Sequence, residues 1–241
     1  MYTMRDIAIT ELRNIDRIAF NPTGSSLAVL RPKKPIAIFS FRERNKKLFE
    51  LKDKRKGLKE KPLMLAMCYG SDARNFIASN SLGEIIVYDT KAYLPQAYIK
   101  CSAPATALAL SSNNYFIASA VGKNIVIWNF QTKEQRTSIP MPATVKEVAF
   151  STDASLLAAT TDDNRLTIID TKNWEKVDIF DKLGGKLTSP SFHPEGKYVS
   201  VVRDNKDIVI VNLKNSVVEQ ELSEAQPGVV GTRFFKNNQN S

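Results

Sequence analysis

The stretches EIIVYD at residues 84–89 and NIVIWN at residues 124–129 lie 40 residues apart and share one design. In each, an apolar run ends in an aromatic residue that is followed by a small polar residue. Three further stretches end in the same way, with an aromatic or β-branched residue before the polar one. The five closing pairs, at successive spacings of 49, 40, 41 and 42 residues, are Phe39-Ser40, Tyr88-Asp89, Trp128-Asn129, Ile169-Asp170 and Val211-Asn212. Self-similarity at about 40 residues indicates a repeat architecture.

A second mark precedes each closing pair by 18 or 19 residues and ends a short alternating stretch such as VKEVAF. The five marks are Phe20, Tyr69, Leu110, Phe150 and Phe192. Between mark and pair lie a turn rich in Pro, Gly, Asn, Asp and Ser and another stretch of strand-forming residues, as in HPEGKYVSVV. Such turn residues preset or tolerate the backbone angles of tight turns, and β-branched and aromatic residues favour strands. With a fourth strand such as KVDIF, each unit is predicted to be a four-stranded antiparallel meander.

The third strands of the units, IIVY and IVIW, are apolar without alternation. This pattern is typical of strands that are buried on both faces. A single four-stranded sheet does not bury both of its faces, so the units must pack sheet against sheet. Sheets stacked face to face around a common axis provide that burial.

A repeat of about 40 residues, with four strands and a Trp-Asp-like pair closing the third, resembles the WD-repeat family. The resemblance covers residues 15 to about 235. Trp128 matches the family's tryptophan, and Asp89 and Asp170 match its aspartate. The usual Gly-His pair is missing, because His193 is the only histidine in the chain. The family's Asp-His-Ser-Trp hydrogen-bond tetrad is therefore incomplete in every blade.

The resemblance implies an all-β fold, a β-propeller of four-stranded antiparallel blades. Five complete blades are expected at about residues 15–61, 62–104, 105–144, 145–186 and 187–227. A partial sixth blade is expected from one strand at 5–12 and another within 228–241, with Phe234 in the position of Phe20. Members of the family usually have seven blades, so the smaller number expected here has three interpretations. The chain is part of a longer polypeptide, a partner donates the missing strands by β-augmentation, or the ring closes as a small one.

Positive charge gathers in one segment, residues 42–61, which holds ten Lys or Arg against four Asp or Glu. This surplus of +6 is most of the formal charge of +9. Such a cluster attracts nucleic acid, anionic membranes or acidic protein tails, or it is simply a solvated loop. Phe49 is its only aromatic residue, which disfavours base stacking on single strands. The candidate residues for binding an acidic partner are Lys46, Lys47, Lys52, Lys54, Arg55, Lys56, Lys59 and Lys61.

Catalytic motifs are missing from the sequence. Any Ser-His-Asp or Cys-His arrangement depends wholly on His193, and no GxSxG, HExxH or GxxxxGK[ST] string occurs. The only cysteines, Cys68 and Cys101, have no CxxC spacing, which favours reduced thiols in an intracellular compartment. We therefore expect no enzymatic activity, no cofactor and no bound metal. No apolar run approaches the roughly 20 residues that span a bilayer, so we expect no membrane insertion.

These observations predict a non-catalytic protein-interaction scaffold, a subunit of an intracellular multiprotein complex in the cytoplasm or nucleus. Its partners would be other proteins, and under the β-augmentation interpretation one of them completes the unfinished blade. The alternative is a basic adaptor whose 42–61 loop binds RNA, ribonucleoprotein particles or acidic protein tails.

Overall fold

Twenty strands in five separate sheets make up the secondary structure of this computed structural model. The described residues are 14–41, 47–51, 55, 61–223, 231, 232 and 234. Within these ranges there is no helix, and hence none long and apolar enough to cross a membrane.

Each sheet is an antiparallel meander of four consecutive strands. Blade 1 consists of β1 (Arg17–Phe20), β2 (Ser26–Leu30), β3 (Ile36–Ser40) and β4 (Lys47–Leu51). Blade 2 consists of β5 (Met64–Tyr69), β6 (Asn75–Asn80), β7 (Glu84–Asp89) and β8 (Pro95–Lys100). Blade 3 consists of β9 (Ala107–Leu110), β10 (Phe116–Val121), β11 (Asn124–Asn129) and β12 (Gln135–Pro140). Blade 4 consists of β13 (Val145–Phe150), β14 (Leu156–Thr161), β15 (Leu166–Asp170) and β16 (Lys176–Phe180). Blade 5 consists of β17 (Leu187–Phe192), β18 (Tyr198–Arg203), β19 (Asp207–Asn212) and β20 (Val217–Leu222).

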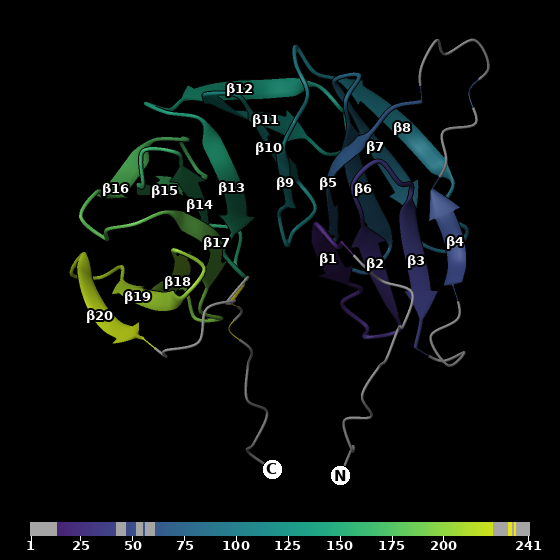
Figure 1. Cartoon of the computed structure of the whole chain (residues 1–241). Helices are drawn as coiled ribbons and strands as arrows, with labels where there is room; N and C mark the ends of the chain where they lie inside the picture. Colours follow the sequence, from purple (N-terminus) through teal and green to yellow (C-terminus); the bar gives the residue numbers. More distant parts are fainter. Residues whose placement is uncertain are drawn as a thin grey trace, which may run out of the picture.

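The five blades follow one another round a ring, with β1, β5, β9, β13 and β17 toward its middle (Figure 1). The outer strands β4, β8, β12, β16 and β20 lie at its periphery. The predicted β-propeller of four-stranded blades is thus confirmed. The partial sixth blade is not, because residues 5–12 and most of 228–241 lie outside the described residues. Gly231, Thr232 and Phe234 are described and lie in no strand.

The core lies at the boundaries between blades, where the repeats pack face to face. In β7 the four consecutive residues Ile85 to Tyr88 are buried, and they alternate between two neighbours. Ile85 and Val87 pack in the hydrophobic cluster shared with blade 3, whereas Ile86 and Tyr88 pack in the cluster shared with blade 1. The predicted shielding of a third strand on both faces is therefore present in this blade.

The polar member of the closing pair caps the turn that follows the third strand. Asp89 Oδ1 accepts hydrogen bonds from the backbone N–H groups of Lys91 and Ala92, both at 3.0 Å. Asn129 accepts the equivalent pair in blade 3. Short side chains with an acceptor oxygen are suited to such Asx-turns. Four residues after each capping residue, the chain adopts a positive φ of 51° to 65°, at Tyr93, Lys133, Trp174 and Ser216.

Trp128 ties the second and third strands of blade 3 together. Its indole Nε1 donates to Ser119 Oγ at 2.9 Å, and the Ser119 hydroxyl donates onward to the carbonyl of Val126 at 3.1 Å. Both side chains are buried. The bond holds the buried indole in one orientation between the two strands.

Candidate functional site

Three of the eight predicted basic site residues lie within the described part of the chain. Lys47 begins the outer strand of blade 1, and Arg55 and Lys61 belong to the connection from blade 1 to blade 2. The Nζ of Lys47 pairs with Glu50 Oε1 at 2.7 Å, and Lys61 is exposed. The other five lie outside the described residues: Lys46, Lys52, Lys54, Lys56 and Lys59.

Arg55 is held in a fixed position against blade 2. Its two terminal nitrogens donate to the two carboxylate oxygens of Glu84 at 2.8 and 2.7 Å. Asn80 Nδ2 donates to the same carboxylate at 2.8 Å. The guanidinium also lies 4.6 Å from the centre of the Tyr98 ring. Glu84 therefore balances the charge of Arg55. The side chain of Arg55 is fixed in one orientation and is not a mobile cation.

Arg55 borders a surface feature that we call the rim groove, formed by two adjoining cavities between blade 1 and blade 2. Their volumes are about 240 and 360 Å³, and they share the side chains of Phe49 and Tyr93 as a common wall. The two rings approach with centroids 5.2 Å apart. One side of the groove is β4 of blade 1, and the other is the β7–β8 turn with the start of β8.

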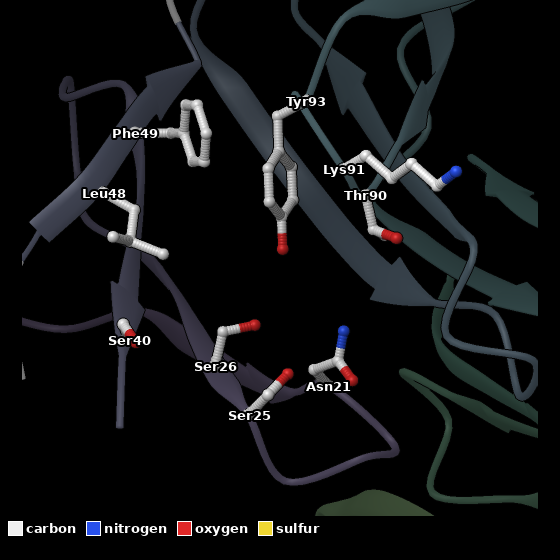
Figure 2. A pocket seen from close by; sticks show the side chains of 9 residues that line it. All are labelled: Asn21, Ser25, Ser26, Ser40, Leu48, Phe49, Thr90, Lys91 and Tyr93. Atoms are coloured by element: carbon white, nitrogen blue, oxygen red, sulfur yellow. The ribbon is translucent and has the colours of Figure 1, made fainter. Parts of the chain in front are cut away.

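The smaller cavity has a mixed lining of hydroxyl, amide and apolar groups. Figure 2 shows the Tyr93 ring between Phe49 and Thr90, with its hydroxyl pointing toward Ser26. That hydroxyl lies 2.6 Å from the hydroxyl of Tyr69, which in turn lies 3.5 Å from Ser26 Oγ. The cavity is lined by Asn21, Ser25, Ser26, Ser40, Leu48, Phe49, Thr90, Lys91 and Tyr93.

Burial is the main reason that the pKa of Tyr69 lies well above its usual value of 10.0, and the contact with Tyr93 raises it further. This phenol is therefore neutral at physiological pH. It offers hydrogen bonds and does not serve as a base.

The larger cavity is mainly apolar and aromatic. Tyr98, which stacks with Arg55, and Leu94 are both exposed at its margin. The cavity is lined by Phe49, Glu50, Leu51, Arg55, Ile86, Tyr88, Ala92, Tyr93, Leu94, Pro95 and Tyr98. A predominantly apolar hollow with a few fixed polar groups is typical of a ligand site in proteins.

Tyr93 is the groove residue that sequence reasoning missed. It occupies the positive-φ position of the β7–β8 turn, and from there it reaches back toward the preceding blade. Trp174 holds the same position in blade 4 and packs edge-on against Phe116 of blade 3, with ring centroids 5.0 Å apart. The sequence did hold a signal for Tyr93. Only two of the five repeats have an aromatic residue four positions after the polar residue of the closing pair.

Most of the other side chains that could act in chemistry are held by neighbours in the fold. His193 Nδ1 accepts a hydrogen bond from the backbone of Glu195 at 3.2 Å within a turn. Asp162 pairs with Lys146 at 2.7 Å, and Asp163 pairs with Arg165 at 3.2 Å. Both cysteines are free thiols, and burial raises the pKa of Cys101 to about 11. A high pKa keeps that thiol protonated and poorly reactive at neutral pH.

Comparison with known proteins adds no identification. No family model matches the sequence, and the search of curated proteins found no match.

Proposed function

We propose that this chain is a WD-repeat protein that serves as a non-catalytic interaction scaffold, a subunit of an intracellular multiprotein complex. The rim groove is the binding surface in this proposal, and its occupant is a short peptide segment of a partner protein. The observation that carries the proposal is the pairing of a cavity of mixed lining with a mainly apolar cavity on either side of Phe49 and Tyr93.

The chemistry of the groove suits a peptide that carries one aliphatic or aromatic anchor residue. The anchor would enter the larger cavity, where Leu94 and Tyr98 supply apolar surface and Arg55 supplies a planar wall. Peptide N–H and C=O groups would meet the hydroxyls of Ser25 and Thr90 in the smaller cavity. Tyrosine and arginine are enriched among residues that dominate binding energy, and a wall already clamped by Glu84 loses little entropy on binding.

A non-catalytic role agrees with the chemistry of the groove. Burial keeps the Tyr69 phenol protonated, and Arg55 is committed to Glu84. These groups are suited to hydrogen bonding and stacking against a ligand.

The basic adaptor remains the second candidate, and the described residues favour it less. Lys47 and Arg55 each pair with a carboxylate, so neither is a free phosphate ligand. Nucleic-acid affinity depends on unbalanced cations that release counterions.

The proposal can be tested by selecting binders from a random-peptide display library against the whole chain. The affinity of each selected peptide is then measured by calorimetry for the wild type, Tyr98→Ala and Tyr115→Ala. Tyr98 and Tyr115 are both exposed tyrosines, at 44% and 60%, but Tyr115 lies on blade 3 away from the groove. We expect Tyr98→Ala to weaken binding by about 2 kcal/mol, roughly thirtyfold, and Tyr115→Ala to leave it unchanged. Equal affinity for the wild type and Tyr98→Ala would refute the proposed groove.

A further inference from the structure

We infer that the smaller cavity of the rim groove binds the carboxylate of an aspartate or glutamate side chain in the partner's peptide. This inference rests on the proposed function, because the same peptide would place its apolar anchor in the larger cavity. It adds the acidic residue that the groove selects. Four side chains carry the argument: Asn21, Ser26, Tyr69 and Tyr93.

Asn21 points an unpaired amide group into the cavity. Its side chain is only 6% exposed. Its Oδ1 accepts hydrogen bonds from the backbone N–H and the hydroxyl of Thr23, at 2.9 and 2.6 Å. Because the oxygen is the only acceptor of an amide, these two bonds fix which way the group faces. Nδ2 therefore points into the cavity (Figure 2), and it has no hydrogen-bond partner among the described residues.

The amide is a feature of blade 1 alone. The residues at the position of Asn21 in blades 2 to 5 are Gly70, Ser111, Ser151 and His193. In blades 3 and 4 the serine hydroxyl donates to the side chain two residues further on, Asn113 or Asp153, at 2.7 and 2.6 Å. In blade 1 the bond runs the other way. Asn21 is its acceptor and keeps both N–H donors unused.

Three hydroxyl groups add one more donor. The Tyr69 hydroxyl lies 2.6 Å from that of Tyr93 and 3.5 Å from Ser26 Oγ. Three hydroxyls carry three protons, and the two contacts between them use only two. Tyr69 lies between the others and is not part of the cavity lining. The remaining proton is therefore held by Ser26 or Tyr93, whose hydroxyls both point into the cavity (Figure 2).

The charge of the lining favours an anion. The described residues that line the smaller cavity include no carboxylate, and Lys91 is the one charged side chain among them. The larger cavity has no such preference. Glu50 is part of its lining, and the charge of Arg55 is balanced by Glu84. The two cavities are thus suited to different side chains of one peptide.

A carboxylate matches the hydrogen-bonding groups of the smaller cavity. It has only acceptor atoms, and it would meet the two N–H groups of Asn21 and one hydroxyl proton. Burying a charge is costly unless hydrogen bonds replace its water, and bonds to an ionised acceptor are stronger than those to a neutral one. Phosphorylated side chains are usually bound by clustered arginines, and no arginine is among the described residues that line this cavity.

The test uses two peptide display libraries that differ only in the central residue, fixed as Asp in one and as Asn in the other. Both are selected against the 241-residue chain. The tightest peptide of the Asp library is then synthesised with Asp and with Asn, and calorimetry measures both affinities. The wild type should bind the Asp form about tenfold or more tightly, because hydrogen bonds to a charged acceptor contribute more.

Asn21→Asp should reverse this preference. It keeps the oxygen that accepts from Thr23 and puts a second carboxylate oxygen in place of the unpaired amide. Repulsion between like charges should weaken binding of the Asp peptide about tenfold or more, so that the Asn peptide becomes the tighter ligand. A purely structural disturbance would weaken both peptides alike.

Asn113→Asp is the matched control for this variant. It makes the same charge change in the equivalent turn of blade 3, at an exposed residue that lines neither cavity. It should leave the preference for the Asp peptide unchanged.

Lys91→Gln provides a second variant, at an exposed position where folding should not suffer. We expect it to weaken binding of the Asp peptide about threefold, as the loss of an exposed charge does, and to leave the Asn peptide unaffected. Lys172→Gln is the matched control, since Lys172 is exposed at the same position of the blade 4 turn. It should change neither affinity.

Three outcomes would overturn the inference. They are equal affinity of the wild type for the two peptides, the same preference in the wild type and Asn21→Asp, and tighter binding when phosphoserine replaces the Asp. In each case the rim-groove proposal stands as long as Tyr98→Ala weakens binding. If the random library yields binders and the Asp library yields none, this inference alone fails. If neither library yields a binder, the rim-groove proposal fails as well.

Discussion

The boundary between blades 3 and 4 and the face of blade 5 that points away from blade 4 are built from the same repeat positions, yet they differ in burial. Ile127 of blade 3 is fully buried against blade 4, whereas Ile210, its equivalent in blade 5, is half-buried. Local sequence does not explain this difference, since NIVIWN and DIVIVN have nearly the same apolar pattern. The burial of this side chain depends on whether another blade packs against it. In a repeat protein each unit gains most of its stability from the interfaces with the units beside it.

The largest expected effect comes from truncating isoleucine to alanine at position 127 and at position 210. Ile127→Ala should lower the free energy of unfolding by about 2–4 kcal/mol, because it leaves a cavity in a closely packed boundary. Ile210→Ala should lower it by less, about 1–2 kcal/mol, since a partly exposed side chain loses less transfer free energy. Urea denaturation followed by circular dichroism measures both values under the same conditions.

Equal losses for the two variants would mean that Ile210 is buried in solution. The face of blade 5 that points away from blade 4 would then be covered in the isolated chain.

A smaller effect concerns the turns, which have one design in inner and terminal blades. The carboxylate of Asp89 accepts backbone N–H bonds, chiefly from Ala92, and these hold its pKa below the usual 3.8. A folded-state pKa below the unfolded one stabilises the protein fully above about pH 4, and this contribution is lost as the pH falls through the folded-state value. Asp89→Asn keeps an acceptor oxygen, as Asn129 does, but does not titrate.

The stability of Asp89→Asn should therefore fall less than that of the wild type between about pH 6 and about pH 3. The difference should stay below about 1 kcal/mol because the carboxylate is largely solvated. Asp181→Asn, at an exposed carboxylate after β16, is the matched control and should follow the wild-type curve. Coincident curves for wild type and Asp89→Asn would show that the turn hydrogen bonds do not depend on charge.

The smallest effect on the folded molecule is expected from the basic segment. Changing Lys54 and Lys56 to Glu lowers the formal charge from +9 to +5. Retention on heparin should weaken, because it follows unbalanced charge. Stability should change little, and so should the affinity of groove-selected peptides. If peptide affinity falls together with heparin retention, the partner is recognised by charge, and the basic adaptor becomes the better description.

Several features could be predicted from individual residues. The constant distance from marks such as Phe150 to pairs such as Ile169-Asp170 predicted where strands one and three would lie. The unbroken apolar run of NIVIWN predicted that β11 would be buried on both faces. Both inferences concern positions within one repeat, where period and turn chemistry act over a few residues.

The rim groove could not be predicted in this way. Its walls come from β4 of one blade and from Tyr93 and Tyr98 of the next, and Arg55 meets Glu84 across 29 residues. The basic segment was singled out for its charge, but the structure uses Arg55 as a paired, stacked side chain. An ion pair between blades depends on how the sheets are rotated about the axis, which no spacing in the chain records.

The amino-acid sequence alone determined the number of complete blades, their strand order and the turns that join them, because these depend on contacts between residues close in the chain. Only the tertiary structure decided which of the equivalent apolar rows are covered and where a groove opens. Burial is a property of two sheets in contact. The repeats at the two ends of the series carry the same pattern as the others but have one neighbour fewer among the described residues.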